Sequence, residues 1–177
     1  DIEETGVIEH LKLEIECYRQ RKNILLGLAK QTDLSASILK KLMSDERFLD
    51  SLGGLNVENA WAMFVPGIYR FPKTISERQL LENIYDAQLF YWNQERTHEA
   101  GSAGLEPQEA MILASIVYSE TKNTNEMPMI AGVYINRLNK KMKLQADPTA
   151  LFAAGDFTSN RVRGKHLNAD SKYNTYR

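Results

Sequence analysis

EPQEAMILASIVYSET, at residues 106–121, is the stretch that most constrains the fold of this chain. Its proline suits the first turn of a helix, where the backbone N–H would lack an internal partner anyway. Apolar residues follow at helical spacing and form one stripe: Leu113, Ile116 and Val117. Glu120 continues the stripe, because it lies three and four residues after the last two of them. We therefore predict a helix over most of this stretch, with Glu120 on its apolar side.

Glu120 is the candidate for acid–base chemistry. A carboxyl group on an apolar stripe loses contact with water, which favours its protonated form near neutral pH. Such a carboxyl group can donate a proton to a leaving oxygen, as the cleavage of a glycosidic bond requires. A glutamate at the end of a helix can equally point outward or pair with a nearby lysine. The spacing alone leaves both interpretations open.

The rest of the chain predicts more helix than strand. Apolar residues at helical spacing predict further helices at 21–31, 35–43, 76–98 and 128–138. Alternation of apolar and polar residues predicts a strand within 7–18, and the proline-containing segment 64–72 is expected to be extended. The glycines at 101 and 104 indicate a flexible break, and the chain after residue 144 is expected to be irregular.

The predicted fold class is α+β, rich in helices and with short strands. A small mixed α/β subdomain is predicted at residues 1–63, and a helix-rich domain at 64–177. The chain begins at Asp1 and stops inside a patterned segment at 173–177. We therefore expect it to be part of a longer protein, with both domains incomplete.

The composition is that of an ordinary globular protein. Of 177 residues, 43% are hydrophobic and 25% charged, with a formal net charge of −1. No overall positive field favours nucleic acid as a partner. The longest uncharged apolar run, 60–69, is far shorter than the ~20 residues of a membrane helix, so a membrane anchor would have to lie elsewhere. Cys17 is the only cysteine and the three histidines are scattered, so no metal site is expected.

A polar loop at 144–149 is the second candidate site. It gathers Gln145, Asp147 and Thr149 around a proline. Such side chains suit sugar hydroxyl and acetamido groups, but they also form ordinary turns. Asn136, on the helix predicted at 128–138, has the same two interpretations: a ligand contact or a surface residue. The basic residues between 137 and 143 are better explained by the helix dipole than by anion binding.

Four blocks of sequence follow one another in a fixed order. They are ILASIVYSET at 112–121, IAGVYINRL at 130–138, MKLQADPT at 142–149 and YNTY at 173–176. In this order they resemble the motifs of the MltG-type (YceG-like) endolytic murein transglycosylases. FVPGIYRF at 64–71 matches the preceding family segment only loosely. The resemblance therefore covers 64–177, which it identifies as the catalytic domain.

The resemblance implies an enzyme anchored in the bacterial inner (cytoplasmic) membrane, with its catalytic domain facing the periplasm or cell wall. Such enzymes cut peptidoglycan glycan strands between N-acetylmuramic acid and N-acetylglucosamine and leave a 1,6-anhydro-N-acetylmuramic acid end. The family's catalytic glutamate corresponds to Glu120, which acts first as acid and then as base. No cofactor is implied. Peptidoglycan is the implied partner, and cell-wall synthesis proteins are further candidates.

The resemblance also suggests a substrate cleft. By the family pattern it would be lined by Asn136, Gln145, Asp147, Thr149, Tyr173 and Asn174. Tyr118 stands where many relatives carry an acidic residue, so an auxiliary carboxylate is absent there. Two other functions stay open: a peptidoglycan hydrolase in which Asp147 activates water, and a non-catalytic scaffold that binds the cell wall.

Overall fold

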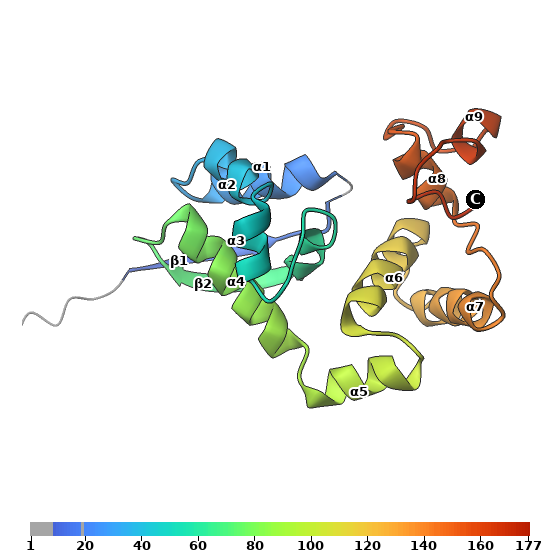
Figure 1. Cartoon of the computed structure of the whole chain (residues 1–177), viewed down its shortest axis with the longest axis horizontal. Coiled ribbons are helices and arrows are strands. Elements are labelled where there is room, and N and C mark those ends of the chain that lie inside the picture. The colour runs from blue at the N-terminus through green and yellow to red at the C-terminus, as the bar shows by residue number, and fades with distance from the viewer. Residues whose placement is uncertain (1–8, 19) are drawn as a thin grey trace, which may run out of the picture. The chain divides into compact units, whose positions relative to one another are not determined.

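The computed structural model of the chain describes residues 9–18 and 20–177. It divides into two compact units, one ending at Gln94 and the other covering Glu95–Arg177 (Figure 1). Helices predominate, and the described strands form one two-stranded antiparallel sheet. The predicted α+β, helix-rich fold class is therefore confirmed. In the described part of the chain, no helix combines the length and the apolar character that crossing a bilayer requires.

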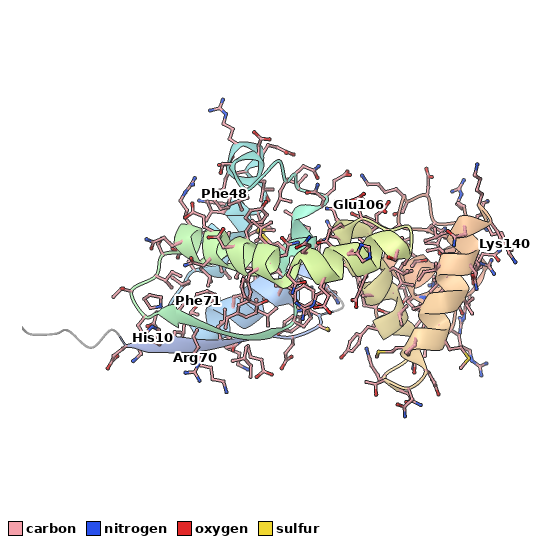
Figure 2. All side chains as sticks on the ribbon, turned by 90° about the horizontal axis from the view of Figure 1, so that it is seen from below. His10, Phe48, Arg70, Phe71, Glu106 and Lys140 are labelled. Carbon is pink, nitrogen blue, oxygen red and sulfur yellow. The ribbon has the colours of Figure 1, made fainter. Side chains whose placement is uncertain are left out.

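The sheet of the first unit consists of β1 (His10–Ile15) and β2 (Gly67–Pro72). Leu13 lies opposite Tyr69 in the register, and Figure 2 shows the two strands side by side. Leu13 and Ile15 are buried, while Glu14 between them is exposed. This is the alternation from which the strand was predicted. Residues 7 and 8 of the predicted strand lie outside the described residues.

The helical segments of the first unit cover this sheet. They are α1 (Arg21–Gln31), α2 (Ala36–Leu42), α3 (Glu46–Ser51), the 3-10 helix η1 (Ala60–Met63) and α4 (Glu77–Tyr91). Ser76 begins α4 with a capping box: its hydroxyl oxygen accepts from Gln79 N, and the Gln79 side chain accepts from Ser76 N. Helices and sheet enclose one core, whose fully buried members include Phe48, Leu80, Leu81 and Ile84.

The long helix predicted from residue 76 to about 98 is in fact two helices. α4 ends at Tyr91, and α5 (Gln94–Ser102) begins after a bend at Trp92, whose ψ of 61° is not helical. The sequence pattern hid this bend because Trp92 continues the apolar stripe of α4. The break predicted near residue 101 lies later: α5 runs to Ser102, and Gly104 follows with a φ of 74°.

The compact units divide at a different place from the domain boundary predicted after residue 63. Residues 64–94 contain β2 and α4, and both belong to the first unit. Strand β2 supplies the hydrogen-bonding partner of β1, so it cannot leave that unit without exposing a strand edge. The assignment of catalytic function to residues 64–177 stays a prediction.

The second unit has its own core. Besides α5 it contains α6 (Pro107–Glu120), α7 (Met127–Asn139), α8 (Asp147–Ala153) and α9 (Gly164–Leu167). α6 packs against α7 and α8, and the buried cluster consists of Leu113, Ile116, Val117, Tyr134 and Ala146. The expectation of irregular chain after residue 144 is wrong for α8 and α9. These helices are too short for a periodic pattern to reveal them, and packing must supply their stability.

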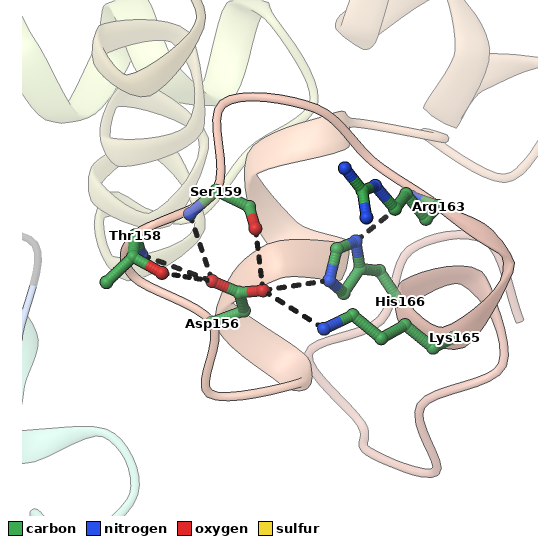
Figure 3. A network of polar contacts seen from close by, with 6 residues as sticks. All are labelled: Asp156, Thr158, Ser159, Arg163, Lys165 and His166. Atoms are coloured by element: carbon green, nitrogen blue, oxygen red, sulfur yellow. Dashed lines mark hydrogen bonds and ion pairs between the residues drawn. The ribbon is translucent and has the colours of Figure 1, made fainter.

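A polar network fixes the chain between α8 and α9 (Figure 3). His166 is fully buried, and its Nδ1 accepts from the backbone N–H of Arg163 at 3.0 Å. The ring proton therefore belongs on Nε2, which donates to Asp156 Oδ2 at 3.1 Å. Ser159 and Thr158 also donate to Asp156 through their hydroxyl and backbone N–H groups. These hydrogen bonds, above all those from Ser159, hold the pKa of Asp156 far below its ordinary value.

Asp156→Asn should lower the Tm of the chain at pH 7. The amide oxygen accepts hydrogen bonds more weakly than a carboxylate, and the amide NH₂ group would face Ser159, Thr158 or His166, which are themselves donors. A lowered folded-state pKa means that Asp156 stabilises the fold above the ordinary aspartate pKa of 3.8 and loses this effect as the pH falls below it. The Tm difference between variant and wild type should therefore shrink below about pH 4.

Thermal unfolding followed by circular dichroism at pH 7 and pH 3 measures this difference. Asp170→Asn is the matched control, because that carboxylate is fully exposed and, among the described residues, its polar contact is with Arg177, at 3.4 Å. A Tm loss for Asp156→Asn that is the same at both pH values would contradict the stabilising role of the charge.

Candidate active site

Glu120 is the last residue of α6 and is exposed. The predicted helical face is correct, since Leu113, Ile116 and Val117 are all buried. The predicted burial of Glu120 is wrong. The buried cluster includes no residue of α6 beyond Val117, so the final turn of the helix extends past the core. The chemistry of Glu120 therefore has to be explained by its polar neighbours and not by an apolar environment.

The nearest of these neighbours is Tyr134 on α7. Its Oη donates to Glu120 Oε1 at 2.7 Å. The rest of Tyr134 is buried, with 7% of the residue exposed, and belongs to the core between α6 and α7. Burial first, and then the hydrogen bond to Glu120 and its charge, raise the pKa of Tyr134 well above the ordinary tyrosine value. The hydroxyl therefore keeps its proton and acts as a donor to the carboxylate.

A second carboxylate–tyrosine pair lies in the same region. Tyr176 Oη donates to Oδ1 of Asp147, the exposed first residue of α8. This hydrogen bond, followed by burial, raises the pKa of Tyr176 to about 12. The charges of Glu120 and Asp147 each act on both tyrosines. Because such effects fall off with distance, each carboxylate lies near enough to influence both tyrosines. That Glu120 and Asp147 form one site stays a prediction.

Arg137 fixes the loop that carries Gln145. It lies one turn after Tyr134 on α7, so the two side chains share a side of the helix. Its Nε donates to the Lys143 carbonyl at 2.8 Å, and its Nη2 donates to Gln145 Oε1. Gln145 has a left-handed backbone, with a φ of 54°, and its N–H donates to the Thr175 carbonyl at 3.1 Å. With Oε1 held by the guanidinium, the Gln145 side chain presents its NH₂ group as a donor.

Thr149 and Asn174, both predicted to bind substrate, direct their side chains into the protein. The Thr149 hydroxyl donates to the Ala146 carbonyl at 2.7 Å, so in its 2.7 Å contact with Thr175 it must accept. Asn174 is buried, and its Nδ2 donates to the carbonyls of Leu167 and Ala169, both at 2.9 Å. The Thr149 contact joins the start of α8 to the last residues of the chain, and the Asn174 contacts join those last residues to the end of α9.

The other two predicted substrate contacts are placed differently. Asn136 is exposed but lies two residues after Tyr134, which turns it about 200° around α7, away from the Glu120 side. Tyr173 is 37% exposed and packs edge-on against Phe152, with ring centroids 5.2 Å apart. Gln145 and Asp147 are both exposed, and the charges of Asp147 and Glu120 act on the same two tyrosines. Asn136 is turned away from that side of α7.

Three residues of this site escaped the sequence analysis: Tyr134, Arg137 and Tyr176. Tyr134 lies at an apolar position of the helix predicted at 128–138, and Arg137 is one of the basic residues that the helix dipole explains. Their contacts join residues 14, 8 and 29 positions apart, across different elements, and no local spacing rule predicts such pairs. The available signal was that each belongs to one of the four blocks that resemble the family motifs. No group of three His, Cys, Asp or Glu side chains among the described residues is arranged to hold a metal ion.

Known proteins resemble both the sequence and the fold. The endolytic murein transglycosylase of Bacillus subtilis is 46% identical over 67 residues, covering 38% of this chain and 18% of that protein. The endolytic murein transglycosylase of Streptococcus pneumoniae serotype 2 is 29% identical over 170 residues, covering 86% of this chain and 31% of that protein. The chain thus spans less than a third of the length of either relative.

The fold comparison agrees. The crystal structure of a YceG-like protein from Listeria monocytogenes matches with a TM-score of 0.75 and 25% identity, over 97% of this chain and 60% of that one. The sequence profile of the YceG-like family matches residues 3–177. Because this match covers almost all of the sequence, the chain belongs to the YceG-like family.

Proposed function

We propose that the full-length protein is an endolytic lytic transglycosylase of peptidoglycan, with Glu120 as its acid and then its base. One observation carries this proposal: Tyr134 holds Glu120 Oε1, while no hydrogen bond from a described residue reaches Oε2. An exposed carboxyl group with one oxygen held and the other open is suited to exchange a proton with a ligand. The two relatives named endolytic murein transglycosylases supply the substrate class.

The proposed reaction has two proton transfers and no added water. Glu120 donates its proton to the glycosidic oxygen, and the bond between that oxygen and C1 of N-acetylmuramic acid breaks. The C6 hydroxyl of the same sugar then attacks C1, and the Glu120 carboxylate removes the hydroxyl proton. The products are a strand with a 1,6-anhydro end and a strand with a free hydroxyl. Glu120 ends the cycle protonated, so a second catalytic carboxylate is not required, unlike the usual arrangement in glycoside hydrolases.

The neighbours of Glu120 fit contacts to an amino sugar. The NH₂ group of Gln145 can donate to an acetamido carbonyl or a carboxylate, and the exposed Asp147 can accept from sugar hydroxyls. Tyr173 offers a partly exposed ring, against which a sugar face can pack. The proposal further places the full-length protein at the bacterial cytoplasmic membrane, with this chain facing the cell wall and glycan strands as its partner.

A hydrolase is the second candidate, because Asp147 lies close enough to Glu120 for both charges to act on Tyr134 and Tyr176. In that reaction Asp147 would activate a water molecule, and cleavage would leave a reducing end in place of an anhydro end. The two candidates thus share the acid but differ in the chemical form of the product.

Glu120→Gln in the full-length protein should reduce the cleavage of glycan strands by roughly a hundredfold or more, since an amide cannot supply or remove the proton. Mass spectrometry of digested peptidoglycan measures the loss of anhydro ends. Glu99→Gln is the matched control, because Glu99 is an exposed helical glutamate of the same unit outside the site. Undiminished cleavage by Glu120→Gln would disprove the assignment of the acid.

Asp147→Asn separates the two reactions. A transglycosylase should retain cleavage and still produce only anhydro ends, with a moderate loss of activity because Tyr176 and the sugar lose a charged acceptor. If the enzyme is a hydrolase, Asp147→Asn should abolish its activity, as Glu120→Gln does. Reducing ends in the wild-type digest, together with an inactive Asp147→Asn variant, would favour the hydrolase.

Arg137→Lys tests how the Gln145 loop is held. Lysine keeps the charge but cannot span both the Lys143 carbonyl and the Gln145 side chain, as the guanidinium does. Hydrogen–deuterium exchange should accelerate at the backbone amides of Gln145 and Ala146, and KM should rise more than kcat falls. Arg161→Lys, at an exposed position of the same unit, is the control. Unchanged exchange in Arg137→Lys would contradict the clamp.

A further inference from the structure

We propose that Tyr134 is a positioning residue, whose hydroxyl holds the Glu120 carboxylate in the one orientation that directs Oε2 to the glycan strand. This inference rests on the proposed function of Glu120. It assigns to Tyr134 no contact with the substrate and no proton transfer of its own. Its role is to restrict a side chain that its own helix leaves mobile.

The Glu120 side chain is free to rotate unless a neighbour holds it. A glutamate has three rotatable side-chain bonds, and an exposed one at the end of a helix samples several rotamers. Glu120 is exposed and is the last residue of α6. The hydroxyl of Tyr134 provides the one hydrogen bond that the described residues make to its carboxylate. Without that bond, nothing among the described residues would select one carboxylate orientation.

Tyr134 itself is held by the core. Its ring belongs to the buried cluster with Leu113 and Val117, so the position of its Oη is set by packing between α6 and α7. A donor fixed in this way, 2.7 Å from Oε1, can localise a mobile acceptor. The same packing that stabilises the second unit therefore orders the carboxyl group at its surface.

The hydrogen bond between the two side chains has a fixed direction, from Tyr134 to Glu120. Burial and the neighbouring carboxylates raise the pKa of Tyr134, so its hydroxyl remains a donor over the pH range of ordinary enzyme assays. A hydrogen bond to a carboxylate favours the charged form. Tyr134 can therefore remain bonded to Oε1 while Glu120 changes from acid to base, and Oε2 stays open to exchange the proton.

Tyr134→Phe tests the inference, since it removes the hydroxyl and keeps the buried ring. We expect kcat for cleavage of glycan strands by the full-length protein to fall roughly tenfold to a hundredfold, as for the loss of a hydrogen bond to a charged group. KM should stay near the wild-type value. The pH profile of cleavage should move upward, because the carboxylate loses a donor that favours its charged form.

The control is Tyr118→Phe, which removes a tyrosine hydroxyl two residues before Glu120 on the same helix. A second modification covers the case in which Tyr134→Phe folds poorly: fluorotyrosine at position 134, with fluorine next to the hydroxyl, keeps the hydroxyl and makes it a stronger donor. It should move the pH profile downward, opposite to Tyr134→Phe. A purely structural role of Tyr134 would change the Tm but not the pH profile.

The outcomes are distinct. Wild-type kcat in Tyr134→Phe, or a pH profile that neither modification moves, would overturn the positioning role while leaving the proposed function intact. Continued cleavage by Glu120→Gln would instead overturn the proposed function itself. Opposite shifts of the pH profile, with Tyr118→Phe like the wild type, would establish the positioning role.

Discussion

The packing of α6 against α7 around Tyr134 is the constraint on which the second unit depends. The Tyr134 ring fills the core with Leu113 and Val117, and its hydroxyl extends from that core to Glu120. One side chain therefore connects the stability of the unit to the placement of its candidate acid. An exposed carboxyl group would otherwise have little to order it, because burial, the usual means of fixing a catalytic glutamate, does not operate at this helix end.

The rest of the site is assembled in the same manner, by side chains that reach across from neighbouring segments. Arg137 holds the loop at Gln145, and Tyr176 holds Asp147 at the start of α8. Thr149 then joins the start of α8 to the end of the chain, and Asn174 ties the end of the chain to α9, both through inward hydrogen bonds. Among the residues that the family pattern suggests as substrate contacts, Gln145 and Asp147 are exposed and present polar groups, while Thr149 and Asn174 hold the scaffold.

Local sequence patterns predicted the helices and their buried faces, because apolar spacing reports which side of a helix packs. Pro107 and the stripe ending at Val117 located α6 correctly. They did not reveal that the core stops at Val117, since burial depends on neighbouring elements that a single helix pattern does not contain. The tyrosine–carboxylate pairs could not be predicted for the same reason, because their members lie 14 and 29 residues apart in the sequence and on different elements. The bend at Trp92 is not visible in the sequence because the apolar pattern of α4 continues through it. The helix α8 is not visible because it is too short to show a periodic pattern.

In the proposed reaction Glu120 is the acid and then the base for cleavage of the glycosidic bond, and the sugar's own C6 hydroxyl, and not water, is the nucleophile. Digestion of peptidoglycan by the full-length protein in water enriched in oxygen-18, followed by mass spectrometry of the new strand ends, tests this most directly. A transglycosylase should produce anhydro ends that carry no oxygen-18. New reducing ends labelled with oxygen-18 would contradict it, because they form only when water attacks the sugar.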